Sequence, residues 1–319
     1  MAAGPDAPGS RVKAFLPALG YAARQGRAIL VLGLLVGILL PDLAATMKEW
    51  LAEMVAGLLF LAALRVGPRQ AVGALGDLGK SITLCAVLQV AMPVAAILAF
   101  LLLGWHGPLA TGLILMAAAA PISGGPNLAI LTGNDPAPAL RQLVLGTALL
   151  PLTVIPVFWL VPALGSPMEI FGSAARLLLI IFASAALAFL LRATVFRNPA
   201  PASIEALDGL SAILMAVLVV GLMSAVGPAL SSDPIAFVLN MAAAFAANFG
   251  LQIAAFFILR RRDPENAVPL AIVTGNRNIA LFLTALPMAI TDPLLLFIGC
   301  YQVPMFLTPI MLNRLYRRR

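Results

Sequence analysis

One arginine stands inside a stretch of the chain that is otherwise apolar. In "VTGNRNIALF", residues 273–282, Arg277 lies between Asn276 and Asn278. A guanidinium binds carboxylates through charge-assisted hydrogen bonds, and side-chain amides add neutral donors. A charge at the middle of a membrane span costs about 2.5–3.5 kcal/mol on insertion scales, so it needs a partner. No Asp or Glu lies mid-span in the sequence. Arg277 therefore binds either an anionic ligand or backbone carbonyls in a structural role.

A second stretch of the chain repeats this pattern. "GGPNLAI" at 124–130 falls on "GNRNIAL" at 275–281 when the chain is offset by 151 residues. At the same offset "VLQVAMPVAA", 87–96, falls on "VLNMAAAFAA", 238–247. Two separate segments that agree on one offset predict an internal repeat.

Both repeated elements predict an interrupted helix. Pro121, Gly124, Gly125 and Pro126 cluster within six residues, and both residue types disfavour a helix interior. We expect a half-helix that ends near Ala120 and a second one that begins at Pro126. In the later stretch the second half-helix is expected to begin near Arg277 or Asn278. The start of a half-helix presents free N–H groups and partial positive charge, which suits an anion.

These patterns define two sets of candidate residues. The predicted substrate-binding residues flank the breaks: Ser123, Gly125, Pro126, Asn127, Gly275, Asn276, Arg277 and Asn278. Helix capping is the alternative role for Asn127 and Asn278. Further polar residues in apolar stretches either line the substrate or ion site or join helices: Gln89, Thr147, Asn240, Asn248, Gln252 and Thr274.

The composition indicates which elements position these residues. The chain is 62% hydrophobic and 10% charged, whereas soluble domains average about 45–50% apolar and about 25% charged. Long continuous apolar stretches predict an all-α membrane protein. Residues 1–27 are expected to be a cytoplasmic or interfacial segment rather than a secretory signal. Polar residues divide the remainder into ten predicted transmembrane helices: roughly 28–42, 47–66, 79–104, 108–133, 138–163, 170–195, 203–227, 234–261, 265–289 and 291–314.

Charge predicts the orientation of these spans. With ten spans and a cytoplasmic N-terminus, seventeen Lys and Arg residues fall on the inside and two on the outside, Arg277 being the remaining one. Cytoplasmic loops carry such an excess. We therefore expect both termini in the cytoplasm, with the chain in the plasma membrane, which is the inner membrane of a bacterium. The net charge of +7 is explained by contacts with membrane lipids and not by nucleic acid.

The offset of 151 residues corresponds to five predicted spans. Because five is an odd number, the second half of the chain must be inverted relative to the first. The predicted repeats are 28–163 and 164–319. Inverted repeats are typical of secondary transporters, with the substrate at the repeat interface, although channels contain repeats too.

Ten spans in two inverted repeats, with breaks in the fourth and ninth, resemble the bile acid:sodium symporter family, within the bile/arsenite/auxin-type transporter superfamily. The motifs that carry the resemblance are "APISGGPNLAILTGN", "LGTALLPLTVIPVF" and "TGNRNIALFLTALP". The resemblance implies a panel domain of spans 1, 2, 6 and 7 and a core domain of spans 3–5 and 8–10 whose discontinuous helices 4 and 9 cross. It also implies that an organic anion is moved, with sodium, by swinging one domain against the other.

The sequence departs from this family where sodium binds. Pro126 replaces a hydroxyl residue before the Asn, and Val273 and Arg277 stand where relatives have an acidic residue and Gln. We predict a secondary transporter of a small organic anion by alternating access that is not sodium-coupled through the family sites, Arg277 supplying positive charge instead. The alternatives are a sodium-coupled symporter of the family and a non-transporting sensor or binding protein.

We expect no enzyme, because no mid-span acid pair, His–acid pair or Ser–His pair supplies acid–base chemistry. No catalytic residue, metal site or cofactor is predicted. Arsenite exporters and auxin-type carriers share the general architecture. The exporters' reactive thiol is not evident here, because Cys85 and Cys300 lie outside the broken spans, whereas a "PN" pair at the first break is reminiscent of auxin-type carriers.

Overall fold

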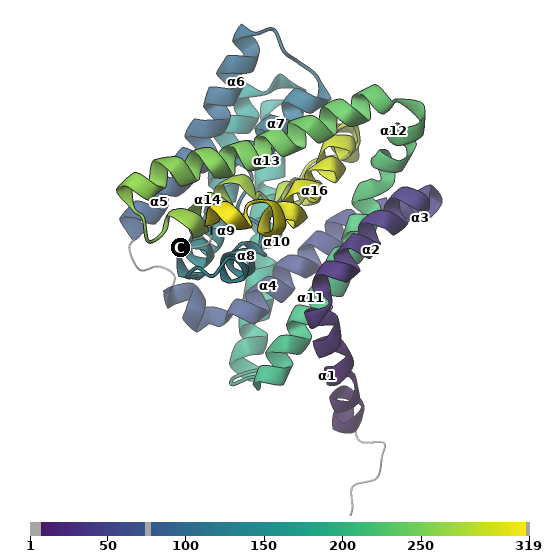
Figure 1. The fold of residues 1–319 in the computed structure, drawn as a ribbon, viewed down its shortest axis with the longest axis vertical. Coiled ribbons are helices and arrows are strands. Elements are labelled where there is room, and N and C mark those ends of the chain that lie inside the picture. Colours follow the sequence, from purple (N-terminus) through teal and green to yellow (C-terminus); the bar gives the residue numbers. More distant parts are fainter. Residues whose placement is uncertain (1–7, 74–77, 317–319) are drawn as a thin grey trace, which may run out of the picture.

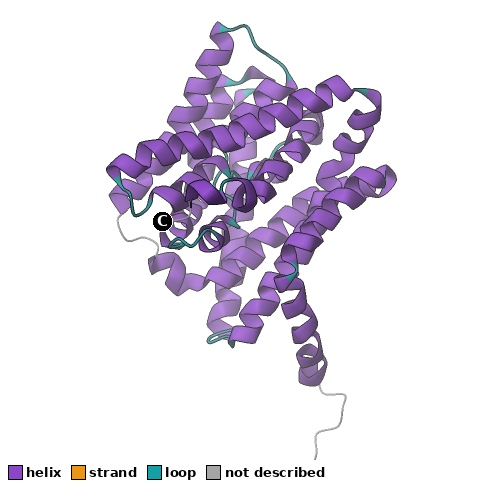
Figure 2. Ribbon diagram, viewed as in Figure 1, coloured by secondary structure: helices purple, strands orange, loops and turns teal. Residues whose placement is uncertain are grey.

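The computed structural model describes residues 8–73 and 78–316, and the regular structure in these ranges is helical (Figure 2). Seven helical stretches there are long and apolar enough to span a bilayer: Leu51–Gly73, Leu78–Leu102, Ala137–Leu160, Pro167–Thr194, Pro201–Ser232, Pro234–Arg262 and Met288–Met311. An eighth forms if α1 (Pro8–Arg24) and α2 (Gly26–Leu39), which meet at a bend of 77°, count as one span. The chain is a multi-pass membrane protein.

The predicted spans at 108–133 and 265–289 are not among these stretches, because neither forms one continuous helix. The first contains α7 (Pro108–Ala118) and α8 (Gly125–Leu131). The second contains α14 (Ala267–Gly275) and the 3-10 helix η4 (Ile279–Thr284). Neither segment is therefore a single long helix, and the ten-span topology with inverted repeats stays a prediction.

One group of helices packs around α11 (Pro201–Leu222). This helix contacts α1, α2, α3 (Pro41–Lys48) and α4 (Leu51–Gly73), and Figure 1 shows α1 and α2 beside it. The helix α4 also packs against α10 (Pro167–Thr194). Small residues allow close approach: a Cβ at Gly33 would lie 2.6 Å from the carbonyl oxygen of Ala216. Such contacts are typical of helix interfaces in membranes. We call α1–α4, α10 and α11 the α11 group.

The other group surrounds the interrupted helices. In Figure 1, α13 passes in front of α14 and α16, and it packs against both. The helix α14 also contacts α8 and α9. We call this set the crossing group. Its members are α5 (Leu78–Ala86), the π-helical turn η1 (Val87–Ala91), α6 (Met92–Leu102), α7, α8, α9 (Ala137–Leu160), α13 (Pro234–Arg262), α14, η4, α15 (Met288–Thr291), η5 (Asp292–Leu294), α16 (Leu295–Met311) and α17 (Asn313–Tyr316).

Short elements and a shared core join the two groups. The 3-10 turn η3 (Met223–Ala225) and α12 (Val226–Ser232) follow α11 and pack against α16. The main cluster of buried residues draws on both groups, with Leu222 and Phe158 among its fully buried members. The interface between the groups is therefore apolar, and polar atoms within it are conspicuous.

Candidate functional site

The two helix breaks lie close to the predicted positions. The first half-helix, α7, ends at Ala118, and α8 begins at Gly125 with Pro126 in its first turn. The sequence placed these ends at Ala120 and Pro126. In the second broken segment α14 ends at Gly275. The continuation begins at Ile279, one residue after Asn278, but as a 3-10 helix, so the expected start is close and the expected helix type is wrong.

The breaks cross each other and pair through their backbones. Pro121 and Arg277 form an isolated antiparallel bridge. The N–H of Ile122 donates to the carbonyl of Asn276 at 2.9 Å, and the N–H of Asn278 donates to that of Ala120 at 2.7 Å. Non-helical backbone at membrane depth must find such partners inside the protein. The pairing therefore explains how both helices can be interrupted at one place.

The Arg277 side chain is held at this crossing by carbonyl oxygens. It is 0% exposed, and its Nη2 donates to the carbonyls of Leu88 and Ala117 at 3.2 and 3.0 Å. Ala117 is in the last turn of α7, where carbonyls lack helical partners and a cation is favoured. Leu88 is in the π-helical turn η1, a kind of turn frequent at functional sites.

The other two guanidinium nitrogens have no protein partner. Nε and Nη1 of Arg277 are buried without a hydrogen bond, and Arg277 is in none of the ion pairs found among the described residues. Buried polar atoms without partners are rare and costly, most of all when charged. A ligand or water at this place would satisfy them.

Arg277 lines a cavity at the interface of the two helix groups. The other polar residues of its wall are Ser123, Asn278 and Gln302, and its volume of about 30 Å³ accommodates one or two water molecules. The α11 group contributes an apolar wall from α4 and α11: Val55, Leu58, Leu59, Ala62, Met215, Leu218 and Leu222. The cavity thus places one buried charge opposite an apolar surface.

Tyr301 on α16 fixes the bend that carries Arg277. Its hydroxyl accepts a hydrogen bond from the backbone N–H of Arg277 at 3.3 Å and donates one to the carbonyl of Gly275. Sequence reasoning named neither Tyr301 nor the neighbouring Gln302. A signal was present, because two adjacent polar side chains interrupt the apolar stretch at 291–314.

Two candidate residues on α13, Asn248 and Gln252, support the crossing. Asn248 Nδ2 donates to the carbonyl of Gly275 at 2.6 Å and to Asn276 Oδ1 at 3.3 Å, and Gln252 Nε2 donates to Asn248 Oδ1 at 2.6 Å. Thr308 and Tyr316 complete the network through Gln252. The side chains of Asn248, Gln252 and Asn276 are fully buried and do not line the cavity. Their polar groups hold unwound backbone and neighbouring helices together.

No protein-family model matches this chain, and no curated protein matches it. The resemblance to the bile acid:sodium symporter family therefore stays a prediction that depends on the three quoted motifs.

Most remaining candidate residues lie away from the cavity and have local partners. Gln89 donates to the carbonyl of Gly146 at 2.9 Å and accepts from Thr153. Asn240 donates to the carbonyl four residues earlier at 2.8 Å, as Thr274 does. These polar groups join or stabilise helices, which is the alternative role considered for them.

The candidates around α8 and on α9 also differ in their placement. Asn127 is exposed on α8, and neither α8 nor η4 shows a side-chain cap, so the capping role of Asn127 and Asn278 is not found. Gly125 and Pro126 are buried, and a Cβ at Gly125 would lie 2.9 Å from Val273. Thr147 is half-buried. Of the fourteen candidates, the cavity wall includes Ser123, Arg277 and Asn278.

Metal coordination has no visible site in the described part of the chain. No group of three or more His, Cys, Asp or Glu side chains there could hold a metal ion. Cys85 and Cys300 are both buried and form no disulfide. The thiol of Cys85 donates a hydrogen bond to Gln142 Oε1 at 3.3 Å.

Proposed function

We propose that this protein is a secondary transporter of a small organic anion, which Arg277 binds at the crossing of the two broken helices. The observation that carries the proposal is the buried guanidinium with two nitrogens lacking protein partners, on the wall of a cavity between two helix groups. An anion would complete the hydrogen bonds of Arg277 and neutralise its charge. Charge-assisted hydrogen bonds of this kind are about twice as strong as neutral ones.

The size of the cavity supports alternating access. About 30 Å³ is too small for an organic anion, so binding requires the α11 group to move away from the crossing. The wall from α4 and α11 is apolar and makes no hydrogen bond to Arg277. Separation there breaks no bond to the guanidinium, whose partners all belong to the crossing group.

Transport without sodium coupling through the family sites follows from the same residues. Val273 is fully buried and apolar, and the Arg277 guanidinium already occupies the space where carbonyl oxygens converge. A cation placed beside it would be repelled. Arg277 acts in this proposal as a permanent, covalently attached positive charge.

We further propose ten spans with both termini in the cytoplasm, in a bacterial inner membrane. Ion pairs support the span count, because each joins residues that the ten-span topology places on one side. Lys48 pairs with Asp292, which the topology places outside together. Arg24 pairs with Glu205, and Arg65 pairs with Asp208, all on the predicted inside. The antiparallel crossing of the two breaks supports inverted repeats in the same way. The composition of the α11 group agrees with the predicted panel domain.

The decisive experiment removes the guanidinium. Arg277→Ala is expected to abolish binding of carboxylates, measured as ligand-induced thermal stabilisation across a panel of monocarboxylates. Millimolar guanidinium ion should restore part of that binding, because it replaces the missing group. Arg65→Ala, which removes a guanidinium that does not line the cavity, is the matched control and should bind normally. Unchanged carboxylate affinity in Arg277→Ala would mean that Arg277 has a structural role and does not bind the anion.

Flux measurements separate transport from the alternatives. In liposomes the wild type should move a bound, labelled carboxylate at the same rate when choline replaces sodium. Binding without flux of any carboxylate would instead indicate a sensor or binding protein. Flux that requires sodium would indicate the sodium-coupled symporter.

A further inference from the structure

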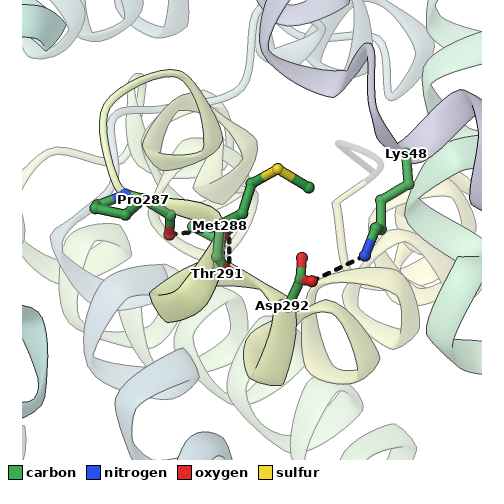
Figure 3. A network of polar contacts seen from close by, with 5 residues as sticks. All are labelled: Lys48, Pro287, Met288, Thr291 and Asp292. Carbon is green, nitrogen blue, oxygen red and sulfur yellow. Dashed lines mark hydrogen bonds and ion pairs between the residues drawn. The ribbon is translucent and has the colours of Figure 1, made fainter.

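One ion pair joins the α11 group to the crossing group. Lys48 Nζ, at the end of α3, lies 2.9 Å from Asp292 Oδ2, at the start of η5 (Figure 3). Both side chains are partly exposed, 27% for Lys48 and 42% for Asp292. The turn that carries Asp292 is closed by the Thr291 hydroxyl, which donates to the carbonyls of Pro287 and Met288 at 3.4 Å (Figure 3).

The two partners lead directly into opposite walls of the cavity. The helix α3 leads into α4 and packs against α11, which form the apolar wall. The turn η5 leads into α16, whose Gln302 and Met305 line the cavity. Lys48 and Asp292 therefore tie the α11 group to the crossing group at one end of the cavity, which we call the Lys48 end.

The other ion pairs found among the described residues lie toward the opposite end. Arg65 lies fourteen residues after the start of α4, about 21 Å along a helix, and pairs with Asp208 of α11. Arg24 of α1 pairs with Glu205 of α11 at 2.6 Å. Both pairs remain inside the α11 group. Among the ion pairs found in the described ranges, Lys48–Asp292 is the one that connects the groups.

Burial along α11 shows the same asymmetry. Its residues 218–222, near the Lys48 end, are all buried, because η3, α3 and α16 cover them. In contrast, most residues from 201 to 215, toward the Arg65 end, are half-buried or exposed. At the Lys48 end the groups are in close contact, because a Cβ at Gly299 of α16 would lie 2.7 Å from the carbonyl oxygen of Leu222.

We propose that the Lys48–Asp292 ion pair is a latch that holds the Lys48 end of the cavity closed and breaks when that end opens. The inference rests on the proposed alternating access. Partly exposed ion pairs contribute little free energy, so the latch biases the equilibrium between open and closed forms and still allows each cycle to proceed. Its effect on the fraction of molecules open at this end is about two- to five-fold, the range for such pairs.

A cysteine in the cavity wall reports which end is open. Ala62 is half-buried, lines the cavity and is placed in none of the proposed binding contacts. The variant Ala62→Cys is made in a chain with Cys85→Ala and Cys300→Ala, and labelled with a membrane-impermeant maleimide from each face of sealed vesicles. We expect faster labelling from the face of the Arg65 end. Lys48→Ala or Asp292→Ala should raise labelling from the other face about two- to five-fold.

Two further variants test whether the ion pair itself controls labelling from the Lys48 end. The charge-swapped pair Lys48→Asp with Asp292→Lys should return labelling to the unaltered rate, because the ion pair is rebuilt. Arg65→Ala, which removes a pair within one group, should leave labelling from the Lys48 end unchanged. No increase in either single variant, no recovery in the swap, or an equal increase in Arg65→Ala would overturn the latch.

Failure of the latch and failure of the proposed function are distinguishable. The labelling needs no anion, whereas the proposed function depends on loss of carboxylate binding in Arg277→Ala. Normal binding in that variant with a labelling shift in Lys48→Ala would leave the latch as a conformational tie in a protein of another function. Loss of carboxylate binding in Arg277→Ala without a labelling shift in Lys48→Ala would overturn the latch and support the anion site.

Discussion

The guanidinium of Arg277 is held by one of its nitrogens and free at the other two. Its Nη2 donates to carbonyls of α7 and η1, and its backbone N–H donates to the Tyr301 hydroxyl. The side chain is therefore already fixed before any ligand arrives. Such preorganisation reduces the entropy lost on binding. It also means that a competing carboxylate placed nearby would find its partner without cost of reorientation.

Gln302→Glu tests whether a carboxylate beside Arg277 pairs with its guanidinium. Gln302 is buried in the cavity wall, and its Nε2 donates to the carbonyl of Ile298 at 3.1 Å. A carboxylate there shares the small cavity with Arg277, so it should pair with the guanidinium and compete with the proposed anionic ligand. We expect at least a tenfold loss of carboxylate affinity with thermal stability retained. Gln302→Leu, which adds no charge, should lose less affinity. Equal binding in Gln302→Glu and the wild type would show that the two side chains do not share a site.

At the scale of elements, the sequence predicts the breaks and misses the direction of side chains. Clustered Pro and Gly locate the interruption before α8 to within two residues, because backbone chemistry alone decides it. The repeat places Asn127 and Asn278 as equivalents, yet Asn127 is exposed and Asn278 lines the cavity. The second break continues as a 3-10 helix, and one residue of shift turns a helical side chain by about 100°.

Polar residues that support unwound backbone look the same in a sequence as those that bind ligands. Asn248 and Gln252 lie on one face of α13, as their spacing predicts, but they bind Gly275, Asn276 and Thr308. The choice between the two roles depends on which helix α13 packs against. That contact is tertiary, so spacing within one helix does not reveal it.

The close packing of α13 on α14 gives a prediction at this scale. A Cβ at Gly275 would overlap the backbone carbonyl of Asn248 and the side chain of Gln252. Gly275→Ala should therefore lower stability by about 1–3 kcal/mol, the usual cost of overpacking. Gly250→Ala, on α13 with open space around it, should be neutral or stabilise by up to about 1 kcal/mol. Thermal unfolding in detergent compares the two, and equal melting temperatures would contradict the packing.

At the scale of the whole molecule, two helix groups meet over an apolar interface that contains one buried charge. Composition and hydropathy are enough to predict a helical membrane protein. The cavity, the network behind it and the ion pair between the groups depend on long-range packing between segments distant in sequence. The sequence predicted ten spans because it counted the two interrupted segments as crossings.

The membrane topology predicts opposite sides for two exposed loops. His106 lies between α6 and α7, and Asn198 lies between α10 and α11, both exposed. In chains with Cys85 and Cys300 replaced by Ala, His106→Cys should react with an impermeant maleimide on intact cells. Asn198→Cys should react only after permeabilisation. Labelling of both from one side would contradict the ten-span arrangement.

The backbone pairing at the crossing has a consequence for amide proton exchange with solvent deuterium. Loops usually exchange quickly, because their amides contact water. The amides of Ile122 and Asn278 lie in non-helical backbone, yet each donates to a carbonyl of the other chain segment. Both should exchange as slowly as amides in the surrounding helices, and they should gain protection together, since each hydrogen bond holds the other in register.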